Sequence, residues 1–231
     1  MPIASRHVGL VALIAAAWLV IGNITHPVGS TEIYTEGVAF VEHTDAYWVI
    51  NHVLLALAFT VIPWLAWAWG KRLTSTVGRT WGAFGVLLAA LGTVNSVLHM
   101  GIDGVAIPAF GEVLQAHGEA AVVGAETLLK IHLASITAWA ILFWGGAQTT
   151  IGVAEVAEGS RRWLGWLMIV CGLLGFAFAG SIAVEGNLTS FTEGVLFRGS
   201  TVGFTVWFIW TAWRLARSEQ TETSPAGVVK P

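Results

Sequence analysis

The sequence predicts an all-helical integral membrane protein built as a bundle of six transmembrane helices. Hydrophobic residues make up 55% of the 231 residues and charged residues only 11%, with a mean hydropathy of +0.73. This balance is far from that of a soluble domain. The apolar residues gather into runs of about 20 residues, long enough to cross a bilayer core of about 30 Å as helices. None of the runs alternates apolar and polar residues, as the strands of a membrane barrel would.

The six predicted spans follow one another with polar breaks between them. They cover roughly residues 8–25, 47–69, 78–99, 126–148, 163–184 and 198–215. Residues 1–217 are therefore expected to form one transmembrane domain. The polar tail of residues 218–231 is expected to be disordered.

The first run could instead be a secretory signal peptide, because Arg6 precedes an apolar stretch that contains several alanines. The apolar residues continue through Trp18 to Ile21, past any cleavage site at the alanines, and the first polar break is Asn23. We therefore expect a retained helix.

Small residues line one face of the third run. In alternating steps of four and three along a helix they form a stripe, which consists of Gly78, Gly82, Gly85, Ala89, Gly92, Ser96 and His99. A face without bulky side chains lets a neighbouring backbone approach closely, which is how helices associate in lipid. The fifth run has a second such face, formed by Gly165, Gly172, Gly175 and Ala179. We expect both to be packing faces, within the chain or toward a second copy or a partner membrane subunit.

The basic residues are unevenly distributed between the predicted loops. If six helices alternate in direction, one side of the membrane receives Arg6, Lys71, Arg72, Arg79, Arg161, Arg162, Arg214, Arg217 and Lys230. Only Lys130 and Arg198 fall on the other side. By the positive-inside rule, both termini are expected in the cytoplasm and the protein in the plasma membrane, with the lipid bilayer as its partner. Nucleic acid is not an expected partner, because the basic residues form no patch with aromatic residues between them.

Polar residues between the runs predict loops. Residues 101–118 are expected to form an outer loop, with a surface helix over residues 112–125, and residues 149–162 an inner loop. A weak internal repeat, Tyr34–Val38 and Phe191–Val195, precedes two inward-running helices. Three repeated helical hairpins would be a reasonable plan for such a bundle, although short matches of this kind arise easily by chance.

Six of the seven histidines map to the outer half of the predicted bundle. His52, His99 and His132 come from three different helices at similar depth, and packed helices about 8–10 Å apart could bring their imidazoles together. Ionisable residues within membrane spans are often functional. These three histidines are therefore the candidate cofactor-binding residues.

The chemistry that imidazoles offer is metal or haem binding. Neutral imidazole binds zinc, copper and iron, and two histidines on facing helices can ligate a haem iron from both sides. Nearby carboxylates could complete a metal shell, so the predicted ligands are His52, His99, His132, Glu126, Asp103 and Glu185. The predicted cofactor is haem b or a transition metal ion in an outward-facing cavity, used for electron transfer or oxidoreductase chemistry. The pattern is unspecific, because HExxH, CxxC and paired HxxxH motifs are absent.

Two other interpretations use the same residues. A polar vestibule of histidines, carboxylates, Lys130 and Arg198 could accept protons or a small solute from outside, as in proton-linked transporters. Charge at mid-depth is nearly absent from the first, third, fifth and sixth runs, which argues against a continuous path to the cytoplasm. The histidines could also be interfacial groups of a non-catalytic subunit. No nucleophile-elbow motif supports hydrolase chemistry, and the sequence leaves open whether the protein is an enzyme.

Overall fold

The computed structural model describes residues 5–25, 46–185 and 191–217, and within these ranges it contains helices and no strand. Four helices of the described part are long and apolar enough to cross a membrane, and a shorter apolar helix covers Arg6–Gly22. The four are Ala46–Gly70, Thr76–Ala106, Glu126–Glu158 and Arg162–Glu185. The prediction of an all-helical chain is therefore confirmed within these ranges, and four of its helices have the length and composition of membrane-spanning helices. The predicted disordered tail, 218–231, and the first copy of the repeat, Tyr34–Val38, lie outside the described residues.

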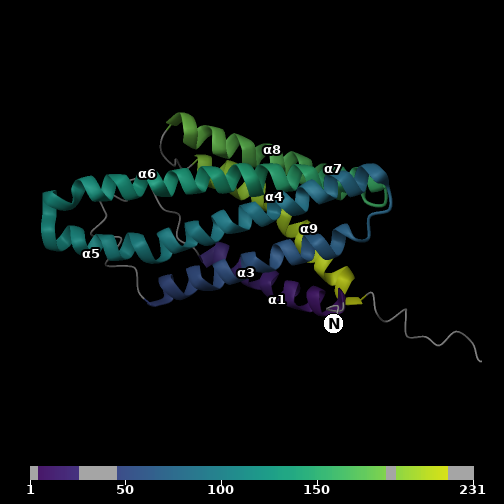
Figure 1. The fold of residues 1–231 in the computed structure, drawn as a ribbon, viewed down its shortest axis with the longest axis horizontal. Helices are drawn as coiled ribbons and strands as arrows, with labels where there is room; N and C mark the ends of the chain where they lie inside the picture. Colours follow the sequence, from purple (N-terminus) through teal and green to yellow (C-terminus); the bar gives the residue numbers. More distant parts are fainter. Residues whose placement is uncertain (1–4, 26–45, 186–190, 218–231) are drawn as a thin grey trace, which may run out of the picture.

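The chain forms a bundle of long helices (Figure 1). The α-helices are α1 (Ser5–Thr25), α3 (Ala46–Gly70), α4 (Thr76–Gly101), α5 (Ile107–His117), α6 (Val122–Trp139), α7 (Gln148–Glu158), α8 (Arg162–Glu185) and α9 (Arg198–Arg217). Wider π-helical turns, Ile102–Ala106, Ala140–Ala147 and Thr192–Phe197, join α4 to α5, join α6 to α7 and precede α9. As a result α4 and α5 form one continuous helix, and so do α6 and α7.

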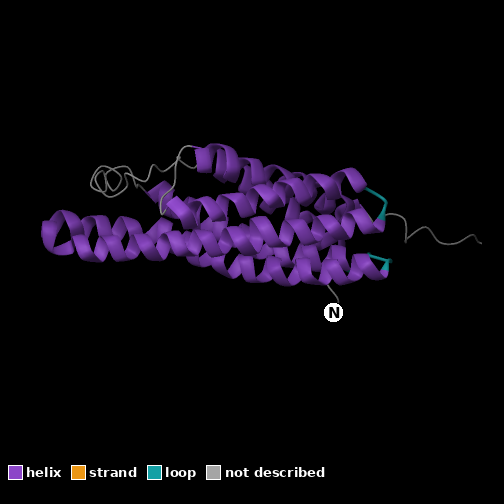
Figure 2. Ribbon diagram, turned by 90° about the horizontal axis from the view of Figure 1, so that it is seen from above, coloured by secondary structure: helices purple, strands orange, loops and turns teal. Residues whose placement is uncertain are grey.

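The predicted outer loop at residues 101–118 is wrong. The helix begun by α4 continues to His117, and a tight turn at Gly118–Ala121 leads into α6. Gly118 has a positive φ of 53°, which glycine adopts without the steric cost that other residues meet. The hairpin of α5 and α6 projects beyond the other helices in both views (Figures 1 and 2). The polar residues of this segment lie within a continuing helix, so they do not mark a break in it.

The predicted inner loop at residues 149–162 is also wrong for most of its length. Helix α7 continues to Glu158 and ends at Gly159, whose φ of 80° is the left-handed conformation typical of a helix C-terminus. The inward face of α7 remains buried as far as Glu155. The span predicted at residues 126–148 is therefore too short at its C-terminal end.

The helices pack as a closed ring. Going round it, α1 contacts α3, α3 contacts α4, α4 contacts the α6–α7 helix, that helix contacts α8, α8 contacts α9, and α9 returns to α1. The last contact is close, because a Cβ added at Gly9 would lie 2.6 Å from the backbone oxygen of Ala212. Aromatic side chains fill the interior, with the rings of Phe143 and Phe204 4.7 Å apart.

Both small-residue faces are packing faces, as predicted. Every residue of the α4 stripe is buried, and so are Gly165, Gly172, Gly175 and Ala179 on α8. Gly85 faces Ile151 of α7, and Gly92 faces Phe143 of the 140–147 segment. The α6–α7 helix covers most of both faces, and Trp69 of α3 and Leu73 of the following turn cover the α4 face at Gly82. Both faces are thus buried within the chain.

One end of the bundle, which we name the basic end, gathers the cationic residues. It contains the N-terminus of α1, the turns before α4 and before α8, and the C-terminus of α9 (Figure 1). Two of its exposed tryptophans are in contact with cations: the Lys71 ammonium lies 3.5 Å from the ring centre of Trp67, and the Arg217 guanidinium 4.3 Å from that of Trp213. Cation–π contacts of this kind stabilise the ends of helices at an interface.

Glu158 holds the turn between α3 and α4 against the end of α7. Its carboxylate accepts hydrogen bonds from the backbone N–H of Thr74 at 2.8 Å and from the hydroxyl of Ser75 at 3.0 Å. The Ser75 hydroxyl in turn accepts from the backbone N–H of Gly78 at 2.9 Å, which caps the N-terminus of α4. These hydrogen bonds fix the turn between α3 and α4 to the C-terminal end of α7.

The close approach at Gly92 predicts a selective loss of stability. A Cβ in Gly92→Ala would lie 2.6 Å from the Cβ of Phe143 and 3.0 Å from its Cα, so we expect the free energy of unfolding to fall by about 1–3 kcal/mol. On the same helix, a Cβ at Gly101 meets nothing within 4 Å. Gly101→Ala should leave stability unchanged or raise it by up to about 1 kcal/mol. Reversible unfolding in mixed micelles measures both, and equal effects would contradict the packing described.

Candidate functional site

The centre of the candidate site is a hydrogen-bonded pair between α3 and the 102–106 turn. His52 is 1% exposed, and its Nε2 lies 3.0 Å from Oδ2 of Asp103. Its Nδ1 lies 2.8 Å from the backbone oxygen of Trp48. The indole N–H of Trp48 donates to the backbone oxygen of Asp103 at 3.1 Å. Gly104 permits this approach, because a Cβ there would lie 2.7 Å from Cγ of His52.

The partners of His52 make the pair sensitive to proton uptake. A carbonyl oxygen and a carboxylate oxygen are both acceptors, whereas a neutral imidazole has only one N–H to donate. A neutral histidine beside a carboxylate can therefore complete only one of these two contacts as a hydrogen bond. One added proton, on His52 or on the Asp103 carboxyl, would complete both.

The other two predicted histidines lie against each other. The ring centres of His99 and His132 are 4.8 Å apart at 30°, and His99 also stacks on Trp139 at 5.3 Å. Nδ1 of His132 is buried and finds no hydrogen-bond partner among the described residues. Asp103 and His52 are near enough to His132 to interact with it electrostatically. The two pairs thus form one group, which we name the histidine cluster: His52, His99, Asp103 and His132.

The structure brings only part of the predicted ligand set together. Glu126 is exposed about two turns before His132 on α6, and Glu185 is exposed at the last residue of α8. Within the described ranges, no three histidine, cysteine or acidic side chains are arranged to hold one metal ion. Metal binding by the cluster stays a prediction.

A second buried acidic residue, Glu155, lies in the segment predicted to be a loop. It is 2% exposed, and its Oε1 accepts hydrogen bonds from the indole N–H of Trp69 at 2.9 Å and of Trp207 at 3.3 Å. Sequence reasoning missed it. The available signal was its spacing: Gln148, Ile151 and Glu155 fall on one helical face, which continues the face of the preceding span.

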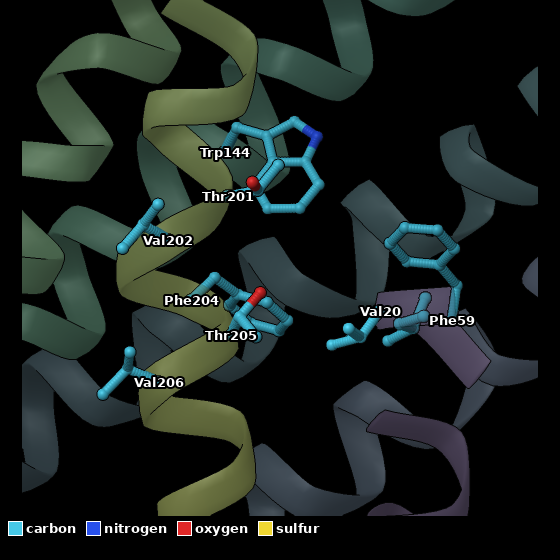
Figure 3. Close-up of a pocket in the computed structure, with 9 residues that line it drawn as sticks. Val20, Phe59, Trp144, Thr201, Val202, Phe204, Thr205 and Val206 are labelled. Carbon is cyan, nitrogen blue, oxygen red and sulfur yellow. The ribbon is translucent and has the colours of Figure 1, made fainter. Parts of the chain in front are cut away.

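A separate cavity of about 280 Å³ lies between α1, α3, α9 and the 140–147 segment (Figure 3). Its walls are Leu19, Val20, Phe59, Trp144, Thr201, Val202, Phe204, Thr205 and Val206. None of the predicted ligands lines it, and the only hydroxyls are those of the two threonines. This cavity is therefore not the predicted polar vestibule.

Comparison with protein-family models, with curated proteins and with solved structures found no match to this chain.

Loss of the Asp103 carboxylate should destabilise the fold. Asp103→Ala removes the carboxyl group that faces the buried Nε2 of His52, and removing one partner of a buried pair costs about 3–5 kcal/mol. Asp103→Asn retains an acceptor oxygen, so it should recover most of this stability. Thermal unfolding of the two variants measures the difference, and an equal loss in both would show that the hydrogen bond to His52 is unimportant.

Proposed function

We propose that the chain crosses the plasma membrane six times, with both termini in the cytoplasm and the histidine cluster toward the outside. Helices α1 and α9 support this proposal, because they pack on the longer apolar helices and complete the ring. The basic end supports the orientation, since cationic residues concentrate in cytoplasmic loops. The histidine cluster lies toward the opposite end, where α3 begins and α4 ends.

We propose further that the histidine cluster binds and releases protons, and that this protein is a proton-linked membrane transporter of a small solute. The observation that carries the proposal is His52, held between two acceptor oxygens, so that one proton added to the pair would complete both hydrogen bonds. Buried carboxylate and histidine groups within membrane spans are the usual elements of proton relays.

We assign different roles in proton binding to different residues of the cluster. The Asp103 carboxylate and the Trp48 carbonyl oxygen hold His52 in one orientation. His132 has one ring nitrogen that makes no hydrogen bond within the described structure, so it can take up a proton without first breaking one. A proton on His132 would be attracted by the Asp103 carboxylate and repelled by a positive charge on His52. The charge of His132 is therefore coupled to the charge of the His52–Asp103 pair.

Tryptophan fluorescence tests the proton uptake. A protonated imidazole quenches an adjacent indole, so the emission of Trp139, stacked on His99, should fall as the pH is lowered through about 8 to 5, the range in which histidine changes charge. The part of the pH response that comes from Trp139 should be lost in His99→Gln and in Trp139→Phe, whereas any response of Trp48, whose ring centre lies 4.4 Å from that of His52, should remain. It should persist in His117→Gln, which changes an exposed histidine at the end of α5. Emission that responds to pH equally in His99→Gln and the unaltered protein would contradict the proposal.

A haem or transition metal ion at the same cluster is the second candidate. The proximity of His99 and His132 favours it. The geometry fits it poorly, because two imidazoles that share a haem iron approach it from opposite faces of the macrocycle, whereas these rings stack on each other. Both nitrogens of His52 already face other atoms. We therefore derive no chemistry through a metal.

The two candidates give different results on purified protein. A proton-binding cluster predicts protein without a Soret band and without stoichiometric zinc, copper or iron. An absorption band or a bound metal that is lost in His99→Gln and His132→Gln, and retained in His117→Gln, would establish the second candidate and overturn the first. Absorption spectra and elemental analysis of the detergent-purified protein are the measurements.

A further inference from the structure

Glu155 is the one acidic residue that the described part of the bundle buries at the basic end. Its carboxylate lies between α3 and α9, where Trp69 and Trp207 direct their indole N–H groups at the same oxygen. The two indoles also pack edge to face, with centroids 5.5 Å apart at 86°. Arg214 on α9 and Glu158 on α7 are the charged groups that act on Glu155. A carboxylate inside a membrane helix, built into such a setting, needs a functional explanation.

Glu155 and the histidine cluster mark the two ends of one helix. His132 and Glu155 are 23 residues apart on the continuous α6–α7 helix. With a rise of 1.5 Å per residue the separation is about 35 Å, which is close to the thickness of a bilayer core. A titratable group therefore lies near each boundary of the apolar layer, on the same structural element.

Buried polar atoms occupy the helix between these two groups. Within the described structure, four of them on this helix make no hydrogen bond: Nε1 of Trp139, Nε1 of Trp144, Oε1 of Gln148 and Oγ1 of Thr149. Oγ of Ser96 on α4 and Oγ1 of Thr211 on α9 are also buried and make no hydrogen bond within the described residues. Buried polar groups in proteins are satisfied by protein or by internal water, and each such exception requires an explanation.

The π-helical segment 140–147 keeps the buried side chains on either side of it facing the interior of the bundle. Its wider turns shift the helical phase, so that Trp139, Phe143 and Trp144 are all buried although their spacing does not fit one narrow α-helical stripe. Gln148 then begins α7 with its Nε2 donating to the backbone oxygen of Ser200 at 2.9 Å. That bond fixes the amide and leaves its oxygen as an acceptor inside the bundle.

We propose that Glu155 is a second proton-binding site, accessible from the basic end, and that internal water along Trp139, Trp144 and Gln148 connects it with the histidine cluster. The transfer is a simple protonation, in which an O–H bond forms on the Glu155 carboxylate and an O–H bond of a hydronium ion breaks. The connection rests on the proposed function of the cluster, whereas the proton site at Glu155 stands independently of it.

Both protonation states of Glu155 are compatible with the surrounding structure. Oε1 can accept both indole N–H groups whether or not Oε2 carries a proton. A change in the protonation of Glu155 therefore need not disturb the packing of α3, α7 and α9. A site that binds and releases protons repeatedly requires this.

Infrared difference spectroscopy tests the site directly. Spectra of the full chain in lipid, recorded at acid and alkaline pH, should contain a carboxyl C=O band that is lost in Glu155→Gln. The glutamine oxygen still accepts both indole N–H groups, so this variant should keep the fold. Glu112→Gln, which changes an exposed residue of α5, should leave the band in place. A spectrum unchanged by Glu155→Gln overturns the proposed site.

Proton flux into vesicles tests the connection. In liposomes that contain a pH-sensitive dye, a potassium gradient with valinomycin should drive faster proton entry with the protein than without it. Glu155→Gln and Gln148→Leu should reduce entry to the level of protein-free vesicles, and Glu112→Gln should not. Entry that Asp103→Asn abolishes but Glu155→Gln leaves intact would overturn this inference and keep the proposed function of the cluster. Entry no faster than in protein-free vesicles would overturn the connection, while the infrared band decides the site at Glu155 separately.

Discussion

The close approach of α4 to the α6–α7 helix is the constraint on which the rest of the structure depends. A Cβ added to Gly92 would overlap the backbone and side chain of Phe143. A Cβ added to Gly85 would likewise overlap the side chain of Ile151. In lipid, burial of apolar surface does not drive helices together, so this kind of fit supplies the association. The α6–α7 helix also receives α8 on its other side, through the reciprocal contact of Gly152 and Gly165. The central helix is thus held between two smooth faces, and the polar groups it carries are held with it.

This arrangement explains why the histidines meet. His99 ends the small-residue stripe, so the same phase that buries the glycines directs its imidazole toward α6. His132 lies on the face of α6 that continues into the core at Trp139. The small-residue stripe could be predicted from the sequence because small residues recur with helical periodicity among bulky ones. The convergence of three helices at one depth followed from counting residues along spans of similar length.

Other features could not be read from the sequence. Polar residues such as Asp103 and Glu155 indicated loops, because hydropathy does not distinguish a loop from a helix that continues with its polar groups buried or beyond the bilayer. Glu155 depends on indole partners that are 86 and 52 residues away in the chain, a relation that only the ring closure of the bundle creates. The π-helical turns at 102–106 and 140–147 have no local signature of turn-forming residues, and they alter the phase on which face assignments depend.

The projecting hairpin of α5 and α6 begins at the histidine cluster. Asp103 lies in the wide turn that joins α4 to α5, at the base of this projection. A stiff helix converts a sideways displacement of its tip into a rotation at its base. The contact between Asp103 and His52 is therefore where we expect a displacement of the hairpin to be transmitted to the rest of the bundle.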